Sequence, residues 1–309
     1  LHVYKDGSVI LNHGGTEMGQ GLLIKVAQVV AAELQIDIDQ VQITSTHTGK
    51  VPNTSATAAS SGADLNGMAA QNAARTIRRR LTAFAATHYD VAENEIEFQH
   101  GQVRIADSSM TFSELVLEAY LHRVQLSATG FYRTPKIWWD AETARGRPFY
   151  YFAYGAAVSE VVVDLLTGEN RVVAVDILHD VGRSLNPAVD AGQIEGGFIQ
   201  GMGWLTTEEV WWDSDGRLMT HAPSTYKIPV CSDRPAHFRL DMYTASKNVE
   251  ATVYRSKAVG EPPLMLALSV HQAIADAISS TSDHAELPQL RTPATPEAVL
   301  DAIQSLRPS

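Results

Sequence analysis

The amino-acid sequence predicts an α+β fold, in which antiparallel or mixed sheets are covered by helices. Short runs with strand character are joined by tight turns, which gives expected hairpins at residues 2–12 and 95–105. These hairpins alternate irregularly with runs whose apolar residues recur at helical spacing. The pattern lacks the steady strand–helix repeat of a doubly wound parallel sheet, so we expect α+β architecture.

The length of the chain indicates two domains. Its 309 residues, 45% of them hydrophobic, exceed the size of about 250 residues at which a single core usually stops growing. We expect a first α+β subdomain over residues 1–135 and a second over residues 136–309. Helices are expected at residues 22–34, 63–86, 188–204 and 264–278 and from Thr111, where Glu114 is placed for a capping box. Strands are expected at residues 2–4, 9–12, 41–44, 124–132, 151–164, 171–178, 207–212 and 237–243 and in the hairpin at 95–105.

Charge and cysteine content limit the partners and the compartment. The net charge is −11, from 24 basic and 35 acidic residues, which argues against nucleic acid as a partner. No apolar run reaches the roughly 18 residues of a membrane span, and no signal-peptide pattern precedes the first strand. Cys231 is the single cysteine, so no internal disulfide and no cysteine-ligated cluster is expected. We therefore expect a cytoplasmic protein, and the strand-like start without Met indicates a fragment of a longer one.

Glu261 is the most distinctive candidate residue. It follows Gly260 and precedes Pro262 and Pro263 at the entrance of the expected helix 264–278. Glycine reaches backbone angles closed to other residues and proline fixes its own φ, so the backbone around this carboxylate is rigid. Two interpretations are open: the carboxylate caps the positive end of the helix, or it is a catalytic group.

A glycine-rich turn at residues 14–21 opens the first expected helix. Turns of this kind bring backbone N–H groups close to an anion at the positive end of a helix. The run has neither the Gly-Lys-Ser/Thr of a phosphate-binding loop nor the GxGxxG spacing of a dinucleotide site. A plain tight turn and an anion site both stay open, and Gln20 is the residue that can donate and accept toward a polar ligand.

Two further segments also have two interpretations each. Residues 52–64 carry small and hydroxyl-bearing side chains, which suit either contact with a flat ligand or a flexible loop that ends in an N-cap. The expected helix 188–204 is interrupted repeatedly by glycine, at about 1 kcal/mol each. This indicates either close helix packing or presentation of Gln193 to a ligand. His179-Asp180 has no further ligand at metal spacing, so a structural histidine is favoured.

Six motifs occur in a fixed order along the chain. They are GGTEMGQG (14–21), VPNTS with TAAS (51–60), GFYRTP (130–135), LNPAVDAGQIEG (185–196), PSTYKIP (223–229) and SKAVGEPP (256–263). Read together, they resemble the C-terminal part of the molybdenum-binding region in the molybdenum hydroxylase family. The resemblance runs from Leu1 to about residue 280, and the second and third motifs favour the xanthine dehydrogenase branch over the aldehyde oxidases and carbon monoxide dehydrogenases. The tail from Thr281 carries no matching motif.

The resemblance implies a surface that binds the molybdenum–molybdopterin cofactor. It assigns cofactor binding to residues of two loops and one helix, namely Met18, Gly19, Gln20, Thr57, Ala59, Ser60 and Gln193. It places Ala59 nearest to molybdenum, with no side chain of this chain bound directly to the metal. It also implies that Glu261 is the catalytic base, because Glu261 matches the family's glutamate in the last motif.

The same resemblance implies hydroxylation of hypoxanthine and xanthine to urate. Glu261 would take a proton from a metal-bound hydroxyl, which metal coordination makes acidic. The implied 2Fe–2S, FAD and NAD sites lie outside this chain, and the residues that orient the purine lie upstream of Leu1. The implied partners are the upstream half of the molybdenum-binding region and an Fe–S/FAD subunit or domain, in a homodimer. Two other hypotheses stay open: a noncatalytic cofactor-docking and assembly module when the chain is isolated, and a related enzyme for an aldehyde or another N-heterocycle.

Overall fold

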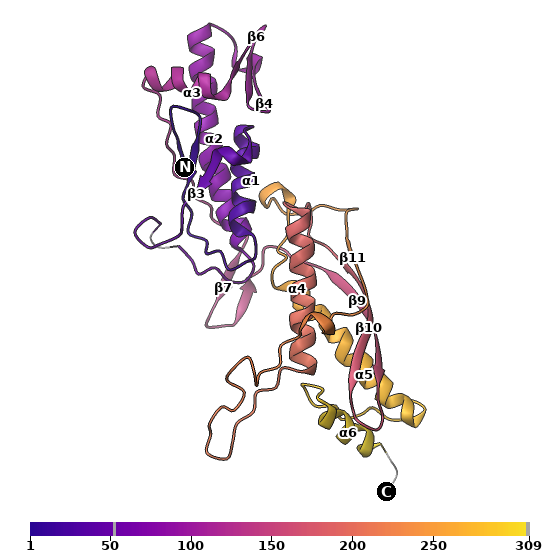
Figure 1. Cartoon of the computed structure of the whole chain (residues 1–309). Helices are drawn as coiled ribbons and strands as arrows, with labels where there is room; N and C mark the ends of the chain where they lie inside the picture. Colours follow the sequence, from indigo (N-terminus) through magenta and orange to yellow (C-terminus); the bar gives the residue numbers. More distant parts are fainter. Residues whose placement is uncertain (52–53, 307–309) are drawn as a thin grey trace. The chain divides into compact units, whose positions relative to one another are not determined.

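The chain forms two compact units in the computed structural model, which describes residues 1–51 and 54–306 (Figure 1). The first unit comprises Leu1–Phe152 with two returning segments, Arg183–Asn186 and Lys247–Ala258. The second unit comprises Ala153–Gly182, Pro187–Ser246 and Val259–Ser309.

These units divide the chain differently from the predicted boundary at residues 135 and 136. Glu250, in the second returning segment, binds Lys136 at 2.6 Å and Arg147 at 2.9 Å. From the same segment, the Tyr254 hydroxyl donates to Glu33 Oε1 at 2.8 Å. These polar contacts hold residues 136–152 and the segment Lys247–Ala258 in the first unit.

Small sheets supply the strands of the first unit. In chain order the strands are β1 (His2–Val3), β2 (Val9–Leu11), β3 (Val41–Ile43), β4 (Ile96–Gln99), β5 (Gln102–Ile105), β6 (Ser108–Thr111), β7 (Trp138–Asp140) and β8 (Arg145–Arg147). β1 and β2 form the predicted hairpin, and β3 joins β2 in parallel. β4, β5 and β6 form an antiparallel sheet that includes the second predicted hairpin. The β7–β8 hairpin was not predicted.

Three helices pack in the first unit, and all three were predicted. They are α1 (Leu22–Leu34), α2 (Gly62–Tyr89) and α3 (Phe112–Leu121). α1 lies along α2, where apolar residues at helical spacing such as Val26, Val30, Ile77 and Leu81 are buried in one core. α3 begins at the predicted capping box, because the Thr111 hydroxyl accepts from the N–H of Glu114 while the Glu114 carboxylate accepts from the N–H of Thr111.

The second unit combines one mixed sheet with three helices. Its strands are β9 (Gly155–Val163), β10 (Asn170–His179) and β11 (His237–Met242), and its helices are α4 (Pro187–Thr206), α5 (Leu268–Ser279) and α6 (Pro296–Ser305). β10 pairs antiparallel with β9 and parallel with β11. α5 lies against β9 and beside α4, and the core between them includes Ile194, Phe198, Ile274 and Ile278 (Figure 1).

Three local predictions were wrong. Residues 124–132 form no strand and make only an isolated bridge, between Ser127 and His2. Residues 207–212 form no strand either and make only an isolated bridge, between Trp212 and Leu218, and Trp211 and Trp212 are more than half exposed. The expected helix 264–278 starts as a 3₁₀ turn, η5 (Pro262–Ala267), before α5 begins at Leu268. The prolines did not reveal this, because the first N–H groups of any helix lack an intrahelical partner and prolines there suit an α-helix as well as a 3₁₀ turn.

The α+β prediction is confirmed by the observed mixture of helices with small antiparallel and mixed sheets. Within the part of the chain that the structure describes, no helix combines the length and apolar character needed to cross a bilayer. The tail that carried no motif contains α6, whose first turn is capped by the Thr295 hydroxyl and whose Val299 and Ile303 join the second core.

Candidate functional site

Glu17 organises the glycine-rich turn at residues 14–21. Its carboxylate accepts hydrogen bonds from the N–H groups of Gly19, Gly21 and Leu23, each at 2.9 Å. Burial acts to raise the pKa of Glu17, but these backbone hydrogen bonds outweigh it and hold the pKa below its usual range. The N-terminus of α1 is therefore stabilised by a carboxylate of its own chain. Of the two interpretations left open for these N–H groups, the structure favours the structural turn over an external anion site.

Gln20 shapes the same turn through its side-chain amide. Its Oε1 accepts from the N–H of Met18 at 2.6 Å, and its Nε2 donates to the carbonyl of Thr16 at 2.8 Å. The tip of the turn is exposed to solvent, and Met18 is 68% exposed. Gly19 has a left-handed φ of +103°, and no atom beyond the adjacent residues lies within 4 Å of the position that a Cβ would take. Met18 and Gly19 thus stand at the exposed tip of a turn that Gln20 fixes.

The loop after residue 53 lies against this turn. Thr57 Oγ1 accepts from the N–H of Thr16 at 2.9 Å, across 41 residues of sequence. A Cβ on Gly14 would come within 2.3 Å of Thr54 Oγ1, so the two segments approach too closely for a larger residue there. The structure thus brings Met18, Gly19 and Gln20 together with Thr57. Pro52 and Asn53 of the motif lie outside the described residues.

Ala59 and Ser60 have an unusual backbone. Both are in the left-handed region, with φ of +55° and +52°, just before α2 begins at Gly62. Non-glycine residues rarely adopt this conformation, and residues that do are concentrated at binding and catalytic sites. Ala59 is exposed, so its small side chain leaves the backbone accessible. Of the two interpretations of this segment, the backbone geometry favours close contact with a bulky ligand over a flexible loop.

His13 is a structural residue that the sequence did not single out. It is 7% exposed, and its Nδ1 accepts from the N–H of Gly15 at 3.0 Å. Burial lowers the pKa of His13, so the ring is neutral and can accept this hydrogen bond. A histidine directly before a Gly-Gly pair was the available signal.

In the second unit, α4 carries Gln193 and packs against the turn that follows Glu261. A Cβ on Gly201 would lie 2.5 Å from the carbonyl oxygen of Leu264, and one on Gly197 would lie 3.1 Å from Pro263. Close packing, one of the two predicted explanations, therefore accounts for these glycines. Gln193 lies one helical turn before Gly197 on the same face of α4.

Glu261 immediately precedes η5 and is exposed. Pro262 and Pro263 follow it, and Pro263 is buried against α4. The Glu261 carboxylate makes no capping hydrogen bond to the turn that it precedes. The capping interpretation therefore loses its main support.

Asp64 and Tyr151 form a hydrogen-bonded pair that the sequence did not reveal. The Tyr151 hydroxyl donates to Asp64 Oδ2 at 2.5 Å and accepts from the N–H of Ala258 at 2.8 Å. Burial raises the pKa of Asp64 to about 6, partly offset by the hydrogen bond from Tyr151. Asp64 follows the Ala59–Ser60 loop, and Ala258 lies three residues before Glu261 in sequence. No local pattern predicts this pair, since 87 residues separate its members.

The residues expected to bind a cofactor are neutral. The first unit holds Met18, Gly19, Gln20, Thr57, Ala59 and Ser60, and the second holds Gln193 together with Glu261. Within residues 1–51 and 54–306, no three His, Cys, Asp or Glu side chains gather as a metal site. Amides, hydroxyls and an open glycine suit an organic cofactor that carries its own metal, because such groups supply hydrogen bonds without binding the ion.

Comparisons with known proteins give a consistent result. A family model described as a molybdopterin cofactor-binding domain matches residues 1–235. A xanthine dehydrogenase/oxidase from Mus musculus is 47% identical over 308 residues, which cover 98% of this chain and 22% of that protein. Aldehyde oxidase 2 from Macaca fascicularis is 43% identical over 303 residues, covering 97% of this chain and 21% of that protein. The solved quinoline 2-oxidoreductase from Pseudomonas putida 86 is 26% identical with a TM-score of 0.84, covering 99% of this chain and 38% of that one. The chain thus spans about a fifth of the length of these curated relatives.

Proposed function

This chain belongs to the family of molybdopterin cofactor-binding domains, and we propose that it supplies the catalytic base and part of the cofactor surface of a longer xanthine dehydrogenase. The resemblance to molybdenum hydroxylases that its motifs predicted is confirmed by these comparisons. The observation that carries the proposal is the setting of Glu261. Glu261 is exposed and directly precedes a turn that glycines of α4 hold closely.

We assign the cofactor surface to the residues expected from the motifs. Met18 and Gly19 contact the pterin from the tip of the first turn, in a conformation that Gln20 maintains. Thr57, Ala59 and Ser60 would lie against the bound cofactor, with Ala59 nearest to the metal. Gln193 binds it from α4. The left-handed backbone at Ala59 and Ser60 supports this assignment, because such strain is seldom kept without a use.

Glu261 acts as the general base in this proposal. When bound, the molybdenum cofactor supplies the two-electron oxidation of the substrate carbon. Glu261 accepts, at a carboxylate oxygen, the proton of the hydroxyl group that becomes the oxygen of the product. The rigid backbone around Glu261 keeps this oxygen in place, which is the main requirement for efficient proton transfer. In the complete enzyme, Fe–S and FAD sites outside this chain would carry the electrons to NAD.

The substrates we propose are hypoxanthine and xanthine, oxidised to urate in purine catabolism. A second candidate is an aldehyde or another N-heterocycle, favoured by the 43% identity to aldehyde oxidase 2 from Macaca fascicularis. We further propose a homodimeric, cytoplasmic enzyme that includes the upstream half of the molybdenum-binding region and an Fe–S/FAD portion. Alone, this chain would serve as a noncatalytic module that docks the cofactor and assembles with those parts.

The test of the base is the replacement Glu261→Ala in the full-length enzyme. We expect the rate of substrate-dependent reduction to fall by about 10² or more, as for a lost general base, with molybdenum content unchanged. Glu209→Ala, which removes another exposed carboxylate of the second unit, serves as the control and should leave the rate unchanged. Joint loss of cofactor and activity in Glu261→Ala would point to a structural role instead.

A further inference from the structure

The sheet formed by β1, β2 and β3 has one covered edge and one open edge. At the covered edge, the N–H of Val3 donates to the carbonyl of Leu126 at 2.9 Å, and the N–H of Ala128 donates to the carbonyl of Leu1 at 3.0 Å. Across residues 1–51 and 54–306, no strand pairs with the outer edge of β3. Open edges present backbone groups that another strand can bond, and proteins usually cover them.

Ile43 directs its backbone groups toward this open edge. The N–H of Thr44 donates to the carbonyl of Leu11 at 3.3 Å. In the parallel ladder, alternate residues bond the same neighbour, so the backbone N–H and C=O groups of Gln42 also point toward β2. The backbone N–H and C=O groups of Ile43 therefore point away from β2, toward the open edge. The N–H of Val41, which shares that direction, is already bonded to the carbonyl of Ile38. Ile43 is thus the residue of β3 best placed to pair with an added strand.

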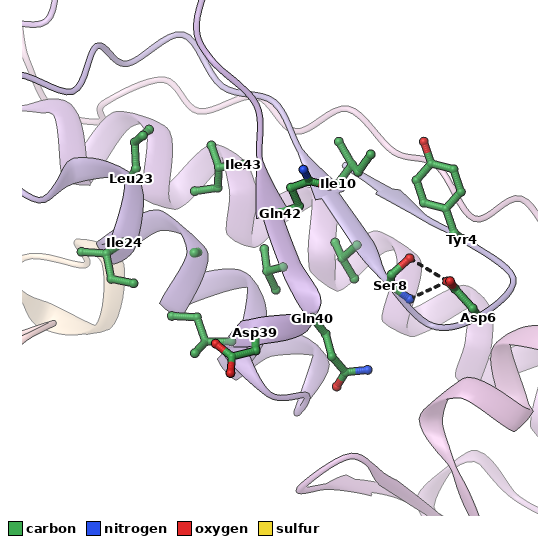
Figure 2. A pocket seen from close by; sticks show the side chains of 14 residues that line it. Tyr4, Asp6, Ser8, Ile10, Leu23, Ile24, Asp39, Gln40, Gln42 and Ile43 are labelled. Atoms are coloured by element: carbon green, nitrogen blue, oxygen red, sulfur yellow. Dashed lines mark hydrogen bonds between the residues drawn. The ribbon is translucent and has the colours of Figure 1, made fainter.

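A mainly apolar groove of about 980 Å³ includes this edge, and its lining comes from β3, from the start of α1, and from β2 with the turn before it. Figure 2 shows Leu23 and Ile24, from the start of α1, beside Ile43 of β3. Ile24 is 41% exposed although it lies next to these apolar neighbours. Asp6 and Asp39 also line the groove. The surface therefore combines an unpaired strand edge, an apolar wall and two carboxylates.

We propose that this groove receives an extended strand from the part of the full-length enzyme that lies outside this chain, added to β3 as a further strand of its sheet. The chain spans about a fifth of the length of its relatives, so most of the polypeptide is available to supply that strand. A strand that fits has apolar side chains at alternate positions for the groove and a lysine or arginine near its ends for the carboxylates.

A second copy of this chain fits the same surface less well. Pairing two β3 edges would bring the Asp6 and Asp39 carboxylates of both copies to one interface, and each chain already has a net charge of −11. The proposal concerns assembly and does not depend on the role of Glu261.

Photo-cross-linking of the full-length enzyme tests which segment occupies the groove. A photoreactive phenylalanine analogue replaces Gln42, which is exposed on β3. The expected product is a cross-link to a peptide from outside residues 1–309, with the alternating apolar pattern described above. A cross-link only to a second copy, or no cross-link, would overturn the proposal.

Hydrogen exchange in the full-length enzyme provides the second measurement. Ile24→Glu places a charge in the groove, and a carboxylate in the first turn of α1 is favourable to the helix. We expect this variant to speed amide exchange at Ile43 by about tenfold or more. Leu117→Glu is the matched control, since Leu117 on α3 is 43% exposed, and it should leave that exchange within about twofold of wild type. Unchanged amide exchange at Ile43 in a folded Ile24→Glu enzyme would contradict strand addition to β3. If that variant does not fold, the cross-linking result at Gln42 alone tests the proposal.

Discussion

Asp64 is partly buried in the first turn of α2 and bonded to the Tyr151 hydroxyl. Its raised pKa means that the native state binds this proton more tightly than the unfolded state, whose pKa is about 4. The stabilisation is therefore complete below about pH 4 and is lost as pH rises through about 6. At neutral pH the charged carboxylate lowers the stability of this region, and Tyr151 limits that effect by donating a hydrogen bond.

Asp64→Asn should remove this pH dependence while keeping an oxygen that accepts from Tyr151. Between pH 4 and pH 7, the free energy of unfolding of wild type should fall relative to the variant by at most about 3 kcal/mol. Denaturant unfolding of both proteins across this range measures the difference. Asp107→Asn, at an exposed turn, is the control and should follow wild type throughout. Parallel curves for wild type and Asp64→Asn would show that burial does not perturb the carboxyl group.

At the scale of elements, the packing of α4 against η5 fixes the segment that carries Glu261. Gly201→Ala should push η5 away, because its Cβ would lie 2.5 Å from a backbone oxygen that has little freedom to move. We expect a loss of roughly 1–3 kcal/mol in the free energy of unfolding.

Gly196→Ala is the matched variant in the same helix. A Cβ there meets nothing within 4 Å, so the higher helix propensity of alanine should stabilise α4 by up to about 1 kcal/mol. Thermal unfolding of the two variants compares them directly. Equal effects of the two substitutions would contradict the packing argument.

Local chemistry explains which elements were predictable. The apolar spacing of α1 and the Thr111–Glu114 capping box depend only on residues close together in sequence. The starts of α1 and α3 were therefore predicted. The 3₁₀ turn Pro262–Ala267, which delays the start of α5, was missed because prolines at the first helical positions are equally compatible with an α-helix. In the glycine-rich turn 14–21, Glu17 was noted only as part of a motif. In the structure its carboxylate accepts hydrogen bonds from N–H groups at the N-terminus of α1. Contacts such as Tyr151–Asp64 depend on the tertiary fold and leave no local pattern.

At the scale of the whole molecule, both units carry residues that we assign to the cofactor, while most of the length of the relatives lies outside the chain. The 309-residue chain alone should therefore show little or no turnover. Incubation with xanthine and an artificial electron acceptor should give no urate above background, even after cofactor is supplied. Urate formation by this chain would show that its own residues suffice to orient the purine.

The most direct test of the account is the rate of substrate reduction per bound molybdenum in full-length Glu261→Gln, measured beside Gln193→Ala. Glutamine keeps the shape of Glu261 but cannot accept the proton, so we predict full molybdenum content and a rate lower by about 10² or more at every pH tested. Gln193→Ala should instead lower molybdenum content while the enzyme that retains metal keeps a rate close to wild type. A Glu261→Gln enzyme with a normal rate per molybdenum would contradict the assignment of Glu261 as the general base.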